Sequence, residues 1–273
     1  MPVARFFPVV SLVVALLAIQ PCQAQEDCGA NFTPTHRIES AQPLSAGTVR
    51  PALSLTGLQL ATPSTVTVVL GGILLPAKAD EATRATLFET LGGLEHASIM
   101  FTPSTESPDR HGRQHGTIQL EDGTNLVERL LAAGAGLADV SFAPCATRFL
   151  TAEAIARSEK RGIWRQSRIW TNLNAAATGL PDFVLGRGKV VSIGRSGRTT
   201  YINFGSNFRT DATVRIREAM RSELVAAGRP PESLNGQVVE VRGWATQRNG
   251  LDMELDSPQA LRLPEQALGT GTD

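Results

Sequence analysis

The sequence predicts a mainly β protein with helices (α+β), built from two small five-stranded barrels in succession. Short segments that alternate apolar and polar residues, or that are rich in β-branched residues, recur in both halves and are separated by Gly, Asn and Asp turns. Helical stretches lie among these strands, and a small-residue run, N-L-N-A-A-A-T-G at 172–179, divides the halves. With 42% hydrophobic residues, the chain has enough apolar surface for real cores.

In the first half, strand patterns and helical patterns alternate. Asp80 and Glu81 open one helix, where the helix dipole favours acidic residues. Thr124 is placed to cap a second helix, and Thr151 is placed to cap a third, which Gly162 ends. The predicted strands are residues 48–60, 65–75, 97–101, 117–121 and 137–142, and the first helix is 78–91.

In the second half, the pattern restarts with three strands, a helix and two strands. This is the order of an OB-type barrel, and the first half fits the same type. An Asn249-Gly250 turn joins the last two strands. The predicted elements are strands 186–193, 199–204, 212–216, 237–245 and 251–255, with the helix at 218–227.

The N-terminus has the layout of a secretory signal. Residues 6–19 are apolar apart from one serine, Arg5 precedes them, and Ala24 ends a small-residue cleavage site. We expect a signal peptide over residues 1–24 and an exported protein, periplasmic or secreted in a bacterium. The alternative is an uncleaved anchor, although the apolar run is short for a membrane span.

The remaining boundaries follow from composition. A polar, Pro-containing stretch at 25–47 predicts an extended arm, and 48–169 should form the first domain. A linker at 170–181 and a second barrel domain at 182–265 follow, and the tail at 266–273 is predicted to be disordered.

The cysteines are interpreted in the light of export. Cys22 leaves with the signal, so Cys28 and Cys145 remain in an oxidising compartment. An even number of cysteines there predicts a Cys28–Cys145 disulfide, with two separate thiols as the alternative.

A stretch from residue 107 to 164 carries a family resemblance. It contains D-R-H-G-R at 109–113, then a strand, a D-G turn, a helix ended by G-L-A, and E-K-R-G-I-W at 159–164. This order resembles the thermonuclease (staphylococcal nuclease-like) family over roughly residues 48–165. The resemblance implies an OB-type barrel, a calcium-dependent nuclease ancestry and an active-site arginine at Arg113.

The catalytic strand departs from that family. The family's catalytic strand has the pattern V-R-L-x-G-I-D-x-P-E, whereas residues 68–77 of this chain are V-V-L-G-G-I-L-L-P-A. The resemblance therefore puts Val69 at the first catalytic arginine, Leu74 at a calcium aspartate and Ala77 at the general base. Residues 40–79 contain no Asp or Glu, and calcium prefers several oxygen ligands including carboxylates. We expect no cofactor and no metal site.

The second half offers a basic cluster as a candidate ligand site. It resembles a small β-domain that follows the nuclease-like domain in many proteobacterial envelope proteins, a resemblance that implies no activity. An OB face binds nucleic-acid strands with aromatic and basic groups. The candidates here are Arg187, Lys189, Arg195, Arg198 and Tyr201. The alternative is a solvated hairpin.

Two functions remain. The first is an exported, non-catalytic binding or scaffolding module of the cell envelope, with nucleic acid or another envelope protein as partner. The second is an active secreted phosphodiesterase with a relocated metal site. Equal numbers of basic and acidic residues, 26 of each, do not indicate a strongly basic nucleic-acid binder. The missing carboxylates favour the first.

Overall fold

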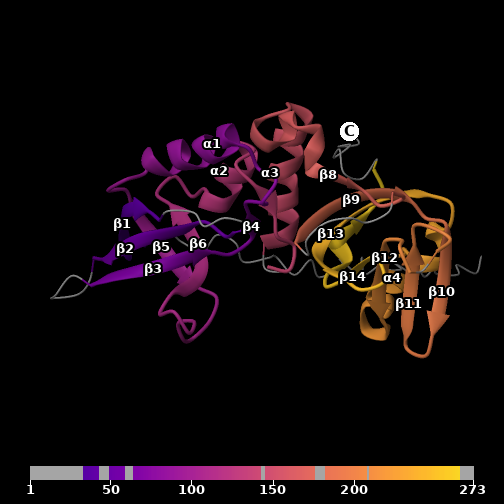
Figure 1. Ribbon diagram of the computed structural model, residues 1–273. Helices are drawn as coiled ribbons and strands as arrows, with labels where there is room; N and C mark the ends of the chain where they lie inside the picture. The colour runs from indigo at the N-terminus through magenta and orange to yellow at the C-terminus, as the bar shows by residue number, and fades with distance from the viewer. Residues whose placement is uncertain are drawn as a thin grey trace, which may run out of the picture.

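The computed structural model describes residues 33–42, 49–58, 64–142, 145–175, 182–207 and 209–264. The predicted signal peptide and C-terminal tail lie outside these residues. Within the described ranges, no helix is both long enough and apolar enough to cross a membrane. Figure 1 shows two halves side by side, with helix α3 upright between them.

The first half contains a closed five-stranded barrel, as predicted. Its strands follow the order β1-β2-β3-β6-β5, and β3 and β6 are parallel. The fold is therefore mostly β and of OB type. The strands are β1 (His36–Ala41), β2 (Ala52–Gly57), β3 (Thr65–Leu70), β5 (Ser98–Pro103) and β6 (Gln114–Leu120).

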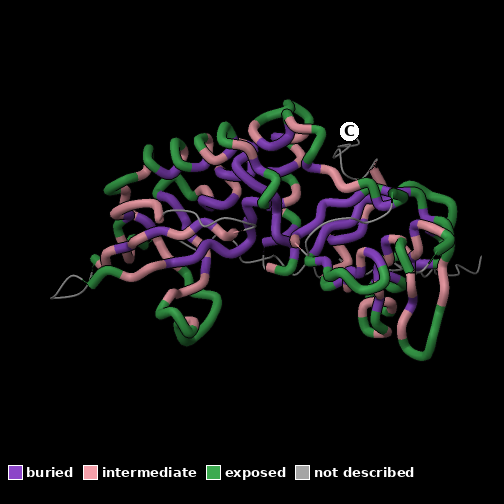
Figure 2. Tube along the Cα trace, in the orientation of Figure 1, coloured by how far each residue is buried: buried purple, intermediate pink, exposed green. Residues whose placement is uncertain are grey.

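Alternation along the strands fills this barrel. In β2, Leu53 and Leu55 point inward with none of their surface exposed, while their neighbours are partly solvated. Ile38 of β1 is equally buried. Figure 2 shows the buried residues as a continuous band through both halves and along α3.

The predicted N-terminal arm is wrong in part, because residues 36–41 form barrel strand β1. Among these residues only Ile38 is a large apolar side chain, so the segment shows no period of two. Its pairing with β2 and β5 makes it a strand.

Three helices cover the barrel: α1 (Glu81–Gly92), α2 (Leu126–Ala132) and α3 (Ala146–Ser158). Asp80 caps α1 by accepting from the Thr83 backbone N–H at 2.9 Å. The other two predicted caps are wrong. Asn125 caps α2, accepting from the Val127 backbone N–H. Thr151 lies inside α3, which begins five residues earlier, and its hydroxyl donates to the Thr147 carbonyl.

The predicted strand at 65–75 is interrupted. It divides into β3 and β4 (Ile73–Leu74), and β4 pairs with β7 (Leu137–Ala138), all that forms of the strand expected at 137–142. Gly72 makes the break, because it has φ +89° and a Cβ there would lie 2.1 Å from the ring of Phe149.

The second half is an eight-stranded sheet with the order β10-β11-β12-β14-β13-β9-β8, and β15 pairs with β13. Strands β10, β11, β12, β14 and β13 repeat the strand order of the first barrel. The parallel pair of β12 with β14 corresponds to that of β3 with β6. The predicted closure into a second barrel is not confirmed. The elements are β9 (Phe183–Lys189), β10 (Ser192–Ser196), β11 (Thr199–Asn203), β12 (Thr213–Arg217), α4 (Glu218–Ala226), β13 (Val238–Gln247), β14 (Leu251–Glu254) and β15 (Leu261–Arg262).

The single strand expected at 186–193 is two strands, because the backbone changes partner there. The Val190 N–H bonds the Gln237 carbonyl beside β13, and the next N–H, of Val191, bonds the Asn203 carbonyl on β11. The first part of the run at 186–193 thus pairs with β13, and its last part pairs with β11.

The predicted linker at 170–181 begins too early. Its first residues form β8 (Trp170–Asn172), which pairs in parallel with β9. Residues 176–181 lie outside the described part. The halves also share apolar cores, because Phe183 and Leu185 pack with the first core, and Val140 and Ala146 pack with the second.

Candidate functional site

Arg113 is held by Asp109 in the turn before β6. One Asp109 oxygen accepts from the backbone N–H groups of His111 at 2.8 Å and Arg113 at 3.0 Å. The other accepts from the Arg113 side chain, at 2.9 Å from Nε and 2.8 Å from Nη2, and lies 3.2 Å from His115 Nε2. The Arg113 side-chain hydrogen bond, followed by the backbone ones, holds the pKa of Asp109 well below its usual range. Asp109 therefore orients Arg113 and partly offsets its charge.

The barrel brings Arg113 next to the strand that would carry the other catalytic groups. In the parallel pairing of β3 with β6, Val68 faces Gln114 and Val69 faces His115. Val69 is 4% exposed, so the residue that pairs with His115, two residues after Arg113, is apolar and closed off from solvent.

The positions expected to hold calcium and the general base carry no oxygen ligand. Leu74 is fully buried in β4 opposite Leu137, and Ala77 is exposed before α1. The nearby Asp80 accepts from the Thr83 hydroxyl at 2.8 Å as part of its capping role. No group of three or more His, Cys, Asp or Glu side chains in the described residues could hold a metal ion. These residues do not fit calcium, which needs several oxygen ligands.

A buried carboxylate nearby is also occupied. Asp139, which follows β7, accepts from Arg50, and its other oxygen accepts from the Ser141 hydroxyl at 2.5 Å. The Asp139 backbone N–H donates to the Gly72 carbonyl at 2.9 Å. These contacts of Asp139 hold the chain in place at the break between β3 and β4, and they were not predicted from the sequence.

Two of the five predicted ligand residues lie on the outer face of β9. Arg187 donates to Glu240 from Nε at 3.1 Å and lies 4.9 Å over the ring of Trp170. Lys189 is exposed, and Asn174 accepts from its backbone N–H. Arg187 therefore serves the junction between the halves.

The other three lie on the β10–β11 hairpin. Arg195 donates to Glu218 of α4 at 2.8 Å, and Arg198 is exposed in the turn. Tyr201 is half-exposed on β11 beside Arg215, while Phe204 is buried, as their spacing of three predicts.

Sequence reasoning missed the charged residues on the outer face of β12 and β14. Arg215 donates to Asp252 at 2.7 Å and to Glu254 at 2.9 Å, and Arg217 also binds Glu254. The alternation of T-V-R-I-R and L-D-M-E could have indicated this face. Each arginine here already has a carboxylate partner.

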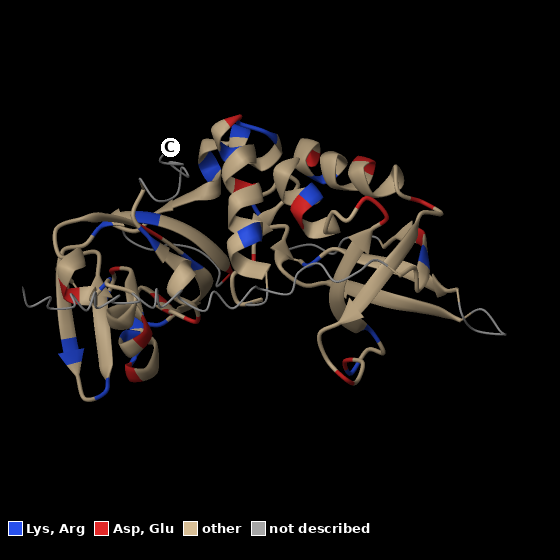
Figure 3. Cartoon of the chain, turned by 180° about the vertical axis from the view of Figure 1, so that it is seen from behind, with Lys and Arg blue, Asp and Glu red and all other residues tan. Residues whose placement is uncertain are grey.

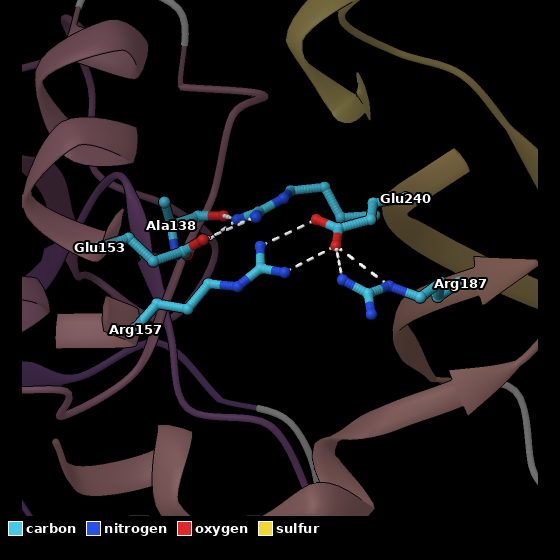
Figure 4. A network of polar contacts seen from close by, with 6 residues as sticks. Ala138, Glu153, Arg157, Arg187 and Glu240 are labelled. Carbon is cyan, nitrogen blue, oxygen red and sulfur yellow. Dashed lines mark hydrogen bonds and ion pairs between the residues drawn. The ribbon is translucent and has the colours of Figure 1, made fainter. Parts of the chain in front are cut away.

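The ion network that joins the two halves was also not predicted from the sequence (Figure 4). Arg242 of β13 donates to both carboxylate oxygens of Glu153 on α3, at 2.8 and 2.6 Å, and both side chains are almost fully buried. Glu240 accepts from Arg157 of α3 at 2.8 and 2.6 Å and from Arg187. The guanidinium of Arg157 also lies 4.8 Å over the Trp170 ring.

The predicted disulfide stays a prediction. Cys145 is 2% exposed immediately before α3. Cys28 lies outside the described residues.

The comparison with known families agrees with the barrel and the Arg113 turn. Residues 77–166 match the family described as Staphylococcal nuclease homologue. A search of curated proteins finds no match to the chain. The matched segment includes α1 to α3, β5, β6 and the Arg113 turn, and it ends just after Trp164. The first half of this chain therefore contains a domain of the staphylococcal nuclease homologue family.

Proposed function

We propose that this chain is an exported binding or scaffolding module of the cell envelope that uses a nuclease-type barrel without cleaving phosphodiester bonds. The family of residues 77–166 connects the chain with nucleic acid. The observation that carries the proposal is the apolar identity of three positions that the family resemblance aligns with catalytic groups: Val69, Leu74 and Ala77.

Their surroundings support this proposal. Metal-assisted cleavage needs an ion to polarise the phosphate and a base to activate water. Leu74 is part of the hydrophobic core, so its position is closed to an ion. Losing one well-placed electrostatic group typically lowers a rate by about 10²–10³-fold, and here three are replaced.

Arg113 remains as a group that can contact an anion. Its side chain is 42% exposed, but Asp109 occupies it and no second arginine stands at position 69. A single arginine whose charge is partly neutralised can contact an anion, but it does not form a set of catalytic groups.

The partner is nucleic acid or another envelope protein. Figure 3 shows basic and acidic residues interspersed over both halves. Exposed basic residues near the hairpin, such as Arg198, and the half-exposed Tyr201 are candidate contacts for a strand.

The test is digestion of DNA and RNA with added calcium, run beside a salt-dependent binding titration. We expect no cleavage and no calcium-induced rise in melting temperature, because a ligand that does not bind the native state cannot stabilise it. Arg113→Ala should lower stability slightly and change no cleavage rate. The control is Arg110→Ala, whose side chain in the same turn contacts His111 at 3.0 Å.

Calcium-dependent cleavage that is lost in Arg113→Ala and kept in Arg110→Ala would contradict the proposal. It would establish the alternative, a phosphodiesterase with a relocated metal site.

A further inference from the structure

A groove of about 620 Å³ lies between α2 and α3, on the helical side of the first half. Its lining includes neither Arg113 nor the residues of the ion network between the halves. The lining residues are Thr124, Glu128, Arg129, Ala132, Ala133, Thr147, Arg148, Thr151, Ala152, Ile155 and Arg161.

Residues on one face of α3 line this groove. On α3, Thr147, Thr151 and Ile155 recur every four residues, which places them on one face. The opposite face of α3 carries Glu153, which is fixed to the second sheet. One wall of the groove is therefore held in place from behind.

The floor of the groove is apolar and formed by small residues. Ala132 and Ala133 on the α2 side and Ala152 on α3 leave the space that larger side chains would fill. Ile155 at its edge is 45% exposed, among the large hydrophobic side chains most exposed to solvent. The groove can therefore receive an apolar anchor side chain of a partner.

Three arginines stand around this floor, and Glu128 is the one acidic residue among the lining residues. Arg148 is 41% exposed and pairs with Glu128, while Arg129 and Arg161 pair with Asp122 and Glu159, which do not line the groove. The pairs of Arg129 with Asp122 and of Arg161 with Glu159 are exposed, and exposed ion pairs contribute little to stability, so an incoming carboxylate can replace Asp122 or Glu159 at small cost. The lining is therefore complementary to an acidic ligand.

These features distinguish the class of partner. A nucleic-acid strand would use stacked aromatic side chains, and the lining contains none. An amphipathic helix places apolar anchors into a groove and charged residues along its edges. We infer that the α2–α3 groove docks an acidic amphipathic helix of a partner protein.

Fluorescence anisotropy with the full chain tests this inference. The probe is a labelled peptide with leucine at every third or fourth position and glutamate elsewhere; a lysine-for-glutamate peptide and a single-stranded oligodeoxynucleotide serve as comparison probes. We expect the acidic peptide alone to bind saturably. Arg129→Gln/Arg148→Gln should weaken it by roughly tenfold, the size expected from losing charge-assisted hydrogen bonds.

Two further variants separate docking from other effects. Ala133→Met fills the floor at a half-exposed position and should weaken binding while leaving the charges unchanged. Arg217→Gln is the matched control, because Arg217 is also an exposed arginine paired with one glutamate, and it should bind the peptide as wild type does.

The inference is overturned if the acidic peptide fails to bind, if Arg217→Gln weakens binding as much as the groove variants do, or if the oligonucleotide competes for the same arginines. None of these outcomes depends on whether the chain cleaves phosphodiesters.

Discussion

At the scale of a single residue, the surroundings of Leu74 show that this position belongs to the hydrophobic core. The family resemblance puts a calcium-binding aspartate at this position, yet Leu74 pairs through β4 with Leu137 and has no exposed surface. Ala77, three residues further on, is exposed. The two positions that the resemblance aligns with catalytic groups therefore have opposite environments in this chain.

Restoring the carboxylates should reveal this difference. Leu74→Asp should lower the free energy of unfolding by at least about 3 kcal/mol, because it removes buried apolar contacts and buries an uncompensated carboxylate. Ala77→Glu should change it by less than about 0.5 kcal/mol, as surface substitutions usually do. Urea denaturation measures both. A Leu74→Asp protein as stable as Ala77→Glu, and stabilised by calcium, would show that the position is open to an ion.

At the level of elements, α3 connects most of the molecule. Phe149 packs into the first core, Glu153 and Arg157 bind the second sheet, and Ile155 lies at the edge of the groove. One helix of 13 residues thus contacts three different surfaces.

The buried ion pair on this helix should matter far more than an exposed one beside it. Glu153→Gln leaves Arg242 buried without its counter-charge and should cost about 3–5 kcal/mol. Glu159→Gln breaks the exposed pair with Arg161 and should cost less than about 1 kcal/mol. Chemical denaturation compares the two, and equal effects would mean that the Glu153 site is hydrated.

The same elements show how far the sequence predicts the fold. Strands with clear alternation and marked turns, such as β11 and β14, and helix α4 with Gly228 beyond it, were predicted to within one residue at each end. β1 could not be predicted, because one isoleucine in a polar segment shows no period. β8 could not be predicted either, since only its pairing with β9 makes it a strand.

The candidate site was predictable where local sequence determines it. The D-x-x-x-R turn fixes the contact between Asp109 and Arg113 within five residues. The ion pairs made by the basic residues of the second half could not be predicted, because Arg187 and Arg195 have partners 53 and 23 residues away. Charge spacing along a chain does not reveal such long-range pairs.

At the level of the whole molecule, two sheets of the same strand order are joined by a charged, partly buried surface. Glu240 lies at its centre. Burial raises the pKa of Glu240, but hydrogen bonds from Arg157 and Arg187 outweigh burial, so the pKa lies below its ordinary value of 4.5.

This shift predicts an acid dependence. The unfolded chain takes up the proton more readily, so the stabilisation by Glu240 is present above pH 4.5 and is lost as the pH falls through the lower folded pKa. Glu240→Gln should be less stable at neutral pH and should lose stability less steeply below pH 4.5. Urea titrations across this range measure the slope. Glu106→Gln, an exposed residue of the β5–β6 loop, should follow the wild-type profile, and an unchanged slope in Glu240→Gln would contradict the assignment.

The junction also predicts what happens when the chain is cut between the halves. A protease site placed within residues 176–181 should yield two fragments that still elute together on gel filtration, because Arg242–Glu153, the Glu240 contacts and the shared apolar residues remain in place. High salt should separate them little, since buried pairs are screened less than exposed ones. Glu153→Gln combined with Glu240→Gln should allow the cut fragments to separate, because the buried Arg242 and the mostly buried Arg157 then lose their counter-charges. Fragments that separate in the wild-type protein at neutral pH would show that the halves are independent domains tied only by the chain.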